Sequence, residues 1–418
     1  MNRPDFIKYT HSAEFREKLE QYEEAVSTGV QSYFDVDDLV DICEYFYNLR
    51  NEAEQAAKAA RYCLSMYPDE DIALFILARV ELTEHKDADE AMKYLEQVDD
   101  YMDNTEGVLI YAEVLLMRGQ LDEALTEMQA EYDKLLRENE DIPEDSAFDT
   151  DDIEQDDAED LKELTAEYPL DVAMLLCDYD HPVQAEQWMG KLNGIPQAKE
   201  FEYWETWGRI NLATNRLEQA IEAINKALDE DSYSVITWLQ LCDAQYQLGR
   251  IDDTLSNTEF ILALDAKCED AWSYRGCCMM ENKRFQEARD CFNKVLEINP
   301  DNVRIHLLLA AISLEEGDTD TAMNGFNKAI FKSGLDPEVI TDLGMLLYDM
   351  GFVDATYRLF KIIFSHFEQS GDIAGCPERM IRQLYLSCLE LGKDDEAEYY
   401  KLFIPFSFGN NDNTLPNT

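Results

Sequence analysis

The sequence predicts an all-α fold in which paired helices repeat along the chain and stack into an α-solenoid. Three tryptophans, Trp204, Trp238 and Trp272, follow one another at intervals of 34 residues. A small residue stands four positions after each of them: Gly208, Cys242 and Gly276. A 34-residue period that combines an aromatic residue with small residues is typical of helix–turn–helix repeats. We therefore expect about nine to ten such units, preceded by an N-terminal capping helix.

The first element, residues 1–36, is expected to contain one amphipathic helix over residues 11–28. Phe15, Leu19, Tyr22 and Val26 recur there at steps of three and four residues, which places them on one helical face. This helix has no partner in the repeat register. We expect it to cover the otherwise exposed apolar side of the first repeat.

The repeat register extends from the tryptophan series in both directions. An N-terminal block over residues 37–137 holds about three units, and a C-terminal block over residues 166–411 holds about seven. The expected units begin at or near residues 37, 71, 105, 166, 201, 235, 269, 303, 337 and 378. The units at 71 and 166 match the pattern least closely. Whether the two blocks form one continuous superhelix stays open.

The turn between the two helices of a unit supports this register. Position 15 of each unit favours a left-handed backbone, which Gly and Asn tolerate best. It holds Asn51, Gly119, Asn215, Gly249, Gly317, Gly351 and Gly392. Lys283 stands at this position in the unit that begins at 269 and departs from the pattern.

Small residues mark the places where the two helices of a unit should cross closely. Position 8 holds Ala78, Ala112, Ala173, Gly208, Cys242, Gly276, Ala310 and Gly344, and position 20 holds Ala56, Ala124, Ala185, Ala220, Ala288, Ala322 and Ala397. Glu44 and Tyr385 depart at position 8. Glu90 occupies an alanine site, and the neighbouring Ala91 indicates a slip of one residue.

The pattern resembles the tetratricopeptide repeat (TPR) family. Residues 269–302 match it best, with Trp272, Gly276, Ala288, Phe292 and Pro300 at the family's marker positions. The resemblance is closest to uncharacterised bacterial TPR arrays. It implies a right-handed solenoid that binds other proteins, and it leaves the partner undefined.

An acidic stretch separates the two blocks. Residues 138–163 contain fourteen acidic residues and one lysine, and Pro143 should stop a helix there. So little apolar surface predicts a mobile linker or loop over residues 138–165. The last residues, 412–418, are expected to form a disordered tail.

The charge of the whole chain limits the classes of partner. The formal net charge is −54, which repels the phosphates of nucleic acids and anionic membranes. A basic or amphipathic segment of a partner protein fits this charge best. The sequence shows neither a secretory signal nor a stretch of about 18 apolar residues that could span a membrane. We expect a cytoplasmic protein whose ten cysteines are free thiols.

The sequence contains no recognisable catalytic or metal-binding motif. Its five histidines lie in different units, and no nucleophile elbow, phosphate loop or zinc motif is present. The cysteines lack metal-site spacing, and residues 149–160 do not match a calcium loop. We therefore expect no enzymatic activity, no cofactor and no metal, with buried packing as the role of the cysteines.

The tryptophans are expected to pack within their own helix pairs, so that Trp238→Ala should cost about 3–5 kcal/mol. Ligand contacts are then expected on first-helix positions of the groove, which the family resemblance places at 2, 5, 9 and 12. The candidates are Glu205, Arg209, Leu239, Asp243, Tyr246, Ser273, Met280, Arg304 and Leu307. Position 5 holds no lysine and position 9 no asparagine, which disfavours a clamp for an acidic C-terminal tail.

The resulting hypothesis is a non-enzymatic scaffold that binds a peptide segment or helix of a partner in its concave groove. One alternative is an assembly or regulatory subunit that docks onto a larger complex through its ends or convex face. A divergent metal-dependent enzyme is the alternative from another class. The sequence leaves the partner's identity and the oligomeric state open.

Overall fold

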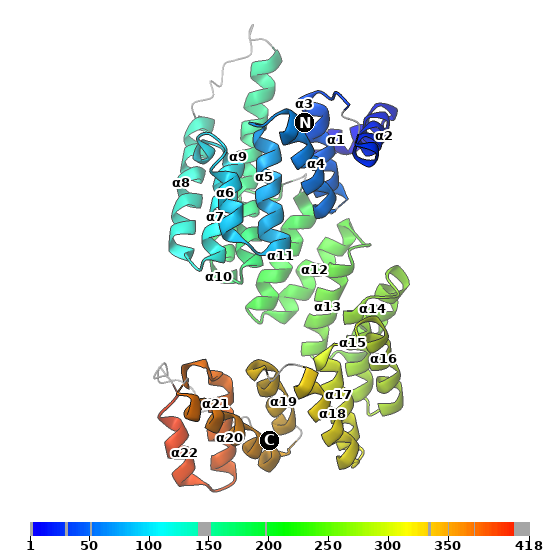
Figure 1. Cartoon of the computed structure of the whole chain (residues 1–418), viewed down its shortest axis with the longest axis vertical. Coiled ribbons are helices and arrows are strands. Elements are labelled where there is room, and N and C mark those ends of the chain that lie inside the picture. Colours follow the sequence, from blue (N-terminus) through cyan, green and yellow to red (C-terminus); the bar gives the residue numbers. More distant parts are fainter. Residues whose placement is uncertain are drawn as a thin grey trace. The chain divides into compact units, whose positions relative to one another are not determined.

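A computed structural model describes residues 3–29, 32–50, 52–140, 152–196, 199–332, 336–349, 351–371 and 373–404. These residues form helices joined by short turns, and no strand occurs among them. The chain divides into two compact units, Met1–Ser232 and Tyr233–Thr418, called unit 1 and unit 2 below. Within each unit, consecutive helices lie side by side in pairs (Figure 1). The expected all-α repeat fold is confirmed.

Unit 1 begins with two helices that precede the first repeat. They are α1 (Arg3–Thr10) and α2 (Ala13–Thr28). The paired helices that follow are α3 (Val36–Glu44) with its π-helical continuation η1 (Tyr45–Leu49), α4 (Ala53–Met66), α5 (Asp71–Val80) with its π-helical continuation η2 (Glu81–His85), α6 (Ala88–Leu95), the 3-10 turn η3 (Tyr101–Asp103), α7 (Thr105–Met117), α8 (Leu121–Glu140), α9 (Asp152–Asp178), α10 (Pro182–Met189), α11 (Glu200–Ala213) and α12 (Leu217–Glu230).

Unit 2 continues the same alternation of first and second helices. Its elements are α13 (Val235–Gln247), α14 (Ile251–Leu264), α15 (Glu269–Glu281), α16 (Phe285–Ile298), α17 (Val303–Glu315), α18 (Thr319–Lys332), α19 (Pro337–Asp349), α20 (Val353–Ser370), the 3-10 turn η5 (Ile373–Gly375), α21 (Glu378–Glu390) and α22 (Asp394–Lys401).

Helix α2 covers the first repeat as expected. Phe15 is buried, and its ring meets the ring of Tyr45 edge-on at 5.1 Å between centroids. Tyr22 is also buried, but Val26 is 46% exposed, so its assignment to the covered face was wrong. Ala25 lies in the core instead, because the face that α2 presents turns slightly from the predicted one. The sequence pattern did not reveal α1, which is only eight residues long.

The turn position adopts the expected left-handed backbone. Positive φ angles occur at Gly119, Asn215, Gly249, Gly317, Gly351 and Gly392, whereas Asn51 lies outside the described residues. Lys283 adopts the same conformation, with φ +57°. The geometry of the turn is therefore set by the packing of the two helices, which holds even a lysine in a region that side chains disfavour.

The helix crossings explain why position 8 is small. A Cβ atom added to Gly208 would lie 2.7 Å from Cγ1 of Ile224 on the partner helix. Gly276 likewise faces the buried ring of Phe292, and Gly344 faces Phe360, each too closely for a Cβ. The small residue of the first helix thus receives a large residue of the second, in the manner of a knob in a hole.

The two π-helical turns account for the irregular register of the first two pairs. Each adds a residue to the end of a first helix. After η2 the left-handed residue is Lys86, and Ala91 is buried while Glu90 is only half-buried. The predicted slip of one residue is confirmed. In the first pair, a unit that begins at residue 37 would place Glu44 at the small position 8. The fully buried residue there is instead Cys43, one residue earlier.

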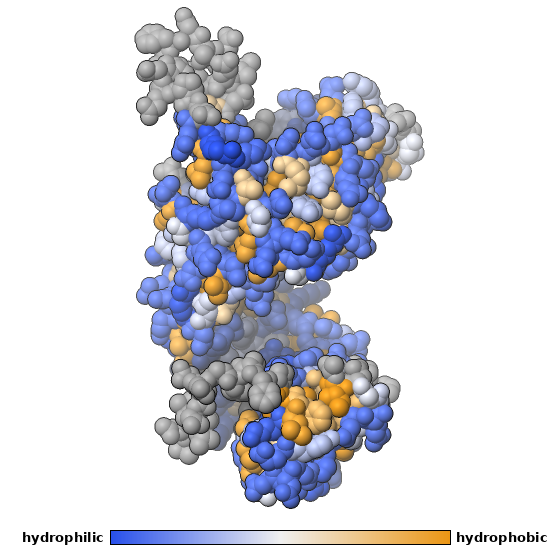
Figure 2. All heavy atoms as spheres, turned by 90° about the vertical axis from the view of Figure 1, so that its left-hand side faces the viewer, coloured by the Kyte–Doolittle hydropathy of each residue, from blue (hydrophilic) through white to orange (hydrophobic). Residues whose placement is uncertain are grey.

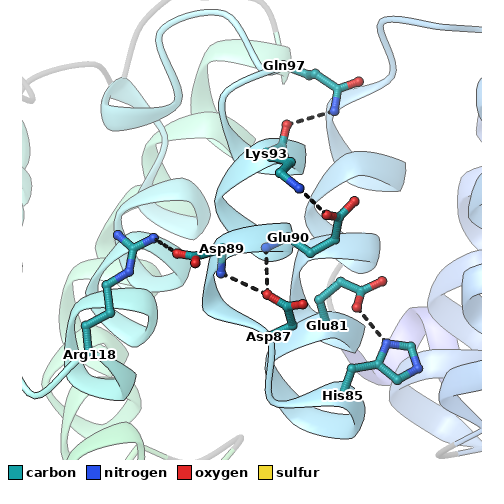
Figure 3. Close-up of polar contacts among 8 residues, drawn as sticks. All are labelled: Glu81, His85, Asp87, Asp89, Glu90, Lys93, Gln97 and Arg118. Carbon is teal, nitrogen blue, oxygen red and sulfur yellow. Dashed lines mark hydrogen bonds and ion pairs between the residues drawn. The ribbon is translucent and has the colours of Figure 1, made fainter.

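Polar contacts hold the new register after η2 (Figure 3). His85 Nδ1 lies 2.6 Å from Oε2 of Glu81. Asp87 caps α6 by accepting hydrogen bonds from the backbone N–H groups of Asp89 and Glu90 at 3.1 and 2.9 Å. Arg118, directly after α7, pairs with Asp89 at 2.6 Å (Figure 3). The Asp87 cap supplies partners to the first N–H groups of α6, which a helix start leaves unpaired.

Part of the acidic stretch is helical rather than a linker. Helix α9 begins at Asp152, so the expectation of a loop was wrong for residues 152–165; residues 141–151 lie outside the described ranges. Acidic residues favour a helix N-terminus because of the helix dipole. Thr165 and Tyr168 of α9 are buried against α8, and the Tyr168 hydroxyl donates to the Met128 carbonyl at 3.3 Å.

Helices on both sides of the acidic stretch share one core. Buried residues of α7, α8, α9, α10 and α11 form a single cluster within unit 1. The division into units instead follows residue 232. The boundaries 37–137 and 166–411 of the predicted blocks stay a prediction, and residues 412–418 lie outside the described part of the chain.

Candidate functional site

The first helices of unit 1 enclose a hollow on the face that they share. It consists of two adjoining cavities of about 420 and 570 Å³, both lined by Tyr47, Arg79, Glu106, Asp171 and Met174. These residues come from η1, α5, α7 and α9, which belong to four successive helix pairs. We call this cavity pair the Arg79 hollow. Arg79 and Glu106 stand at positions 9 and 2 of their units, which are groove positions in the predicted register.

Arg79 is fixed in the hollow by two carboxylates. Its Nε donates to Oε1 of Glu106 at 2.6 Å, and its Nη1 lies 3.9 Å from Oε2 of Glu113. Burial alone would lower the pKa of Arg79, but the two carboxylates outweigh this effect and raise it. The guanidinium therefore stays charged and holds α5 to α7.

Glu113 is the most buried acid of the hollow. Its side chain is 10% exposed, and burial raises its pKa while Arg79 opposes the rise. The hydroxyl of Tyr179 donates a hydrogen bond to Glu113 Oε1 at 3.1 Å. Glu113 is thus a structural anchor with its oxygens already engaged, because a buried carboxylate requires such partners.

The remaining acids of the hollow differ in whether a basic residue neutralises them. Asp171 accepts from Lys199 at 2.7 Å, and Asp178 accepts from Arg209 at 2.6 Å. Glu44 has no ion pair with any residue in the described ranges, and burial raises its pKa. Glu44 is therefore the carboxylate best placed to receive a cation from outside.

Apolar side chains complete the walls beside these acids. They are Ile72, Phe75, Ile76, Leu109, Met174 and Leu175. Phe75 and Leu109 stand at position 5 of their units, which is a groove position in the predicted register. Phe75 is almost completely buried, whereas Ile72 is 38% exposed at the edge. An apolar floor next to an unpaired carboxylate could bind a peptide that has a basic side chain next to an apolar one.

Two predicted contact residues border the Arg79 hollow. Glu205 and Arg209 lie on α11, with Arg209 Nε 4.0 Å from Glu205 Oε1. Arg209 also bonds to Asp178, which lines the hollow. The structure therefore brings this predicted pair to the site, where Arg209 neutralises one wall rather than standing free for a ligand.

A second group of predicted residues meets in unit 2. The hydroxyl of Tyr274 donates to Asp243 Oδ1 at 3.0 Å, and the rings of Tyr246 and Tyr274 lie 6.1 Å apart. Burial raises the pKa of both tyrosines, and the nearby Arg304 opposes that rise. Asp243, Tyr246 and Arg304 are thus neighbours. The prediction missed Tyr274, which stands one residue after a predicted position, although its aromatic character was a usable signal.

The other predicted contacts in unit 2 are less available. Leu307 is 5% exposed and packs in the core, so it offers almost no surface to a ligand. Leu239 and Met280 are half-buried against core clusters. The Ser273 hydroxyl donates to the Glu269 carbonyl of its own helix at 2.9 Å. The repeat pattern of the sequence could not show that these residues belong to the core. Core positions and groove positions alternate within one turn of the first helix.

The tryptophan series packs within its own pairs. Trp238 contacts the ring of Phe260 at 4.7 Å between centroids, and the Trp272 indole N–H donates to the Ala266 carbonyl at 3.1 Å. Lys226 lies over the Trp204 ring, 3.7 Å from its centroid. All three tryptophans are half-buried. Trp272 also packs against the core cluster that contains Phe292 of α16, so the series agrees with a role in packing.

The cysteines behave as packing residues where the structure describes them. All ten are free, and burial raises the pKa of Cys242 to about 12, which keeps it a neutral thiol. Among the described residues, no three or more His, Cys, Asp or Glu side chains gather as a metal site would require. Within the same ranges, the helices fall short of the length and apolarity needed to cross a bilayer.

Comparison with known proteins identifies the repeats. Tetratricopeptide repeat family models match residues 45–105 in unit 1 and residues 269–302 and 291–324 in unit 2. The Arabidopsis thaliana protein CTR9 homolog is 25% identical over 126 residues, and the mouse RNA polymerase II-associated protein 3 is 28% identical over 87 residues. These alignments cover 30% and 21% of this chain but only 12% and 13% of the two relatives.

Some solved structures align with part of this chain. A tetratricopeptide repeat protein from Parabacteroides merdae aligns over 59% of this chain and 94% of its own, with a TM-score of 0.46 and 16% identity. MamA aligns over 39% of this chain and 95% of its own, with a TM-score of 0.35 and 18% identity.

The fold and the matched segments together define the class of protein. Stacked helix pairs with a left-handed turn residue and a small-to-large crossing define a helical repeat protein. The family models then give the repeat type, because they match in both units. Over these segments the chain is similar to tetratricopeptide repeat proteins. Such proteins are typically non-enzymatic scaffolds for protein interaction.

Proposed function

We propose that this protein binds a segment of a partner protein, extended or helical, on the first-helix face of unit 1. The observation that carries the proposal is the Arg79 hollow, which four successive helix pairs line. A peptide laid across these helices would meet an apolar wall and a carboxylate within one site. Binding modes of this kind use side-chain anchors at regular spacing.

The charges of the hollow favour a basic and apolar segment. Arg79, Lys199 and Arg209 are occupied by acids of the same site. Glu44 keeps a carboxylate at the edge beside the apolar Ile72 and Phe75. A lysine or arginine placed next to a leucine-like residue would satisfy both features. The net charge of −54 would also speed the approach of such a partner.

Peptide display on the immobilised full-length chain tests this proposal. We expect randomised peptides to be enriched for a basic residue adjacent to an apolar one. Glu44→Lys should abolish the enrichment, because it removes the free carboxylate and adds a like charge. Glu222→Lys is the matched control, since this acid is exposed on α12 away from the hollow. Enrichment of acidic peptides, or equal loss in both variants, would refute the proposal.

A second candidate is docking through the last helix pair, as an assembly subunit would do. Leu386 and Leu389 of α21 are each 43% exposed, and Leu402 after α22 is 76% exposed. Apolar surface also gathers on unit 2 in the face that Figure 2 shows. The double variant Leu386→Glu with Leu389→Glu should reduce capture of a docking partner and leave selected groove peptides bound. If this double variant also lost the peptides selected on the Arg79 hollow, the last helix pair and the hollow would not be separate binding surfaces.

A further inference from the structure

A separate cavity of unit 1, apart from the Arg79 hollow, has a lining unlike the acidic surface of the chain. It measures about 340 Å³ and lies between α8, α9 and the segment that follows α10. Its polar lining residues include Lys162, Lys191, Asn139 and Asn193. None of the lining residues that the structure describes is acidic, although the chain carries 89 acidic residues. Two lysines and two amides make this cavity, the Lys191 pocket, suited to a small anion.

Lys191 is held at the edge of the pocket by aromatic rings. Its Nζ lies 3.0 Å from the centroid of the Trp188 ring and 5.3 Å from that of Tyr132, and it donates to Oε1 of Gln129. Trp188, Tyr132 and Tyr168 contact one another with centroid distances of 5.8 to 6.2 Å. The amine therefore has a defined position on a rigid aromatic wall.

The burial of the Lys191 amine favours its neutral form. Burial lowers the pKa of Lys191 to about 8, and Asp133 opposes the shift. The titratable groups that face it are Tyr132 and Asp133 of α8 and Lys162 and Tyr168 of α9. A neutral amine is the nucleophilic form of lysine.

We propose that Lys191 is a modification site that accepts an acyl group from small acyl phosphates, whose phosphate the Lys191 pocket holds. The lone pair of the neutral Nζ attacks the acyl carbon, so that an N–C bond forms and the C–O bond to phosphate breaks. The phosphate leaves with the bonding electron pair, and the amine loses a proton to solvent. The product is a neutral amide in place of a basic side chain.

Lys226 supplies an internal control for the aromatic contact. Its Nζ lies over the Trp204 ring at 3.7 Å, yet the residue is exposed on α12 and lies outside the lining of the Lys191 pocket. If the aromatic contact alone made a lysine reactive, Lys191 and Lys226 would be acylated at the same rate. Because only Lys191 lines the pocket, we expect faster acylation at Lys191.

The test is acetylation of the full-length chain by acetyl phosphate, followed at each lysine by mass spectrometry. At neutral pH, Lys191 should react roughly tenfold faster than Lys226, because burial lowers the pKa of Lys191 and its pocket holds the phosphate of the reagent. Its rate should rise with pH and level off above about 8. Equal rates at the two lysines, or a Lys191 rate that keeps rising like that of an ordinary surface lysine, would overturn the proposal.

Lys162→Gln separates the pocket from the amine itself. Lys162 is exposed, so its substitution should leave the fold intact. The variant should slow acetylation of Lys191 by acetyl phosphate but not by a neutral acetyl ester of N-hydroxysuccinimide, which has no phosphate to hold. Equal rates of wild type and variant with acetyl phosphate would refute the role of the pocket.

Discussion

The most regular and the least regular helix pairs of this chain use their residues differently. In the pair α15–α16, the residues at recurring positions serve packing: Gly276 faces Phe292, and Trp272 packs against the core cluster that contains Phe292. In the pairs α3–α4 and α5–α6, an additional residue enters each first helix as a π-helical turn. Tyr47 of η1 and Thr83 of η2 then line the Arg79 hollow.

This difference indicates where to look for binding in a repeat protein. Residues that define the repeat are already engaged with each other, so they are poor candidates for ligand contacts. Departures from the repeat, such as π-helical turns, often accompany functional sites. Unit 1 combines two such departures with a hollow and an unpaired acid, whereas the tryptophan series marks scaffold. Four predictions probe this contrast.

The largest effect is expected from truncation of a buried crossing residue. Phe292→Ala should destabilise the protein by about 4 kcal/mol, because the ring is fully buried against Gly276. Trp238→Ala should cost only about 2 kcal/mol, below the range expected from sequence, because its indole is half-buried. Urea unfolding of both variants measures the two values. A greater loss for Trp238→Ala would reverse the assignment of packing roles.

Overfilling the same crossing should have a somewhat smaller effect. Gly276→Val places methyl groups where the Phe292 ring lies, so a cost of about 2–3 kcal/mol is expected. Adding Phe292→Leu should recover part of the loss, whereas Glu281→Val on the exposed side of α15 should change stability little. Thermal unfolding of the single and double variants is the check, and additive losses would contradict the close crossing.

The turn residue offers a stabilising change. Lys283 holds a left-handed backbone, so Lys283→Gly should stabilise the protein by about 0.5–1 kcal/mol. Gly249→Lys, at the equivalent turn of the preceding pair, should destabilise by a similar amount. Chemical unfolding of the two variants compares the turns. Changes of the same sign in both would mean that the left-handed backbone is not what distinguishes them.

The smallest effect concerns the irregular turn of the second pair. The hydrogen bond to Glu81 raises the pKa of His85. The imidazolium therefore stabilises the fold below its ordinary pKa of about 6.5, and this contribution disappears as the pH rises through the raised value. His85→Asn should flatten the pH dependence of unfolding in that range. An unchanged profile would show that the contact does not couple to folding.

The sequence predicted the scaffold more completely than the site. Periodic residues such as Trp238, Gly276 and Ala288 report contacts inside a pair, and every pair repeats the same geometry. The Arg79 hollow instead depends on Arg79, Glu106 and Glu44, which come from three successive pairs. The first two of these pairs contain π-helical turns that shift the register by one residue. A register counted at 34 residues cannot include such a shift, so the prediction favoured the regular units.

The acidic stretch shows a related limit. Composition alone predicted a linker over residues 138–165, because acidic residues dominate it. The structure places helix α9 from Asp152 onward, where Tyr168 and Trp188 make an aromatic core with Tyr132. Tyr132 precedes the acidic residues, and Tyr168 and Trp188 follow them. Tertiary packing of these rings stabilises α9, including its acidic first turns.

The most direct test of the account compares the two units as binding surfaces on the full-length chain. A basic and apolar peptide selected on the wild type would be titrated against Glu44→Lys in unit 1 and Asp243→Lys in unit 2. We predict that Glu44→Lys weakens binding at least tenfold, or about 1.4 kcal/mol, while Asp243→Lys leaves the Kd within twofold. Loss of binding in Asp243→Lys with an unchanged Glu44→Lys would contradict the claim that the irregular pairs of unit 1 form the binding site.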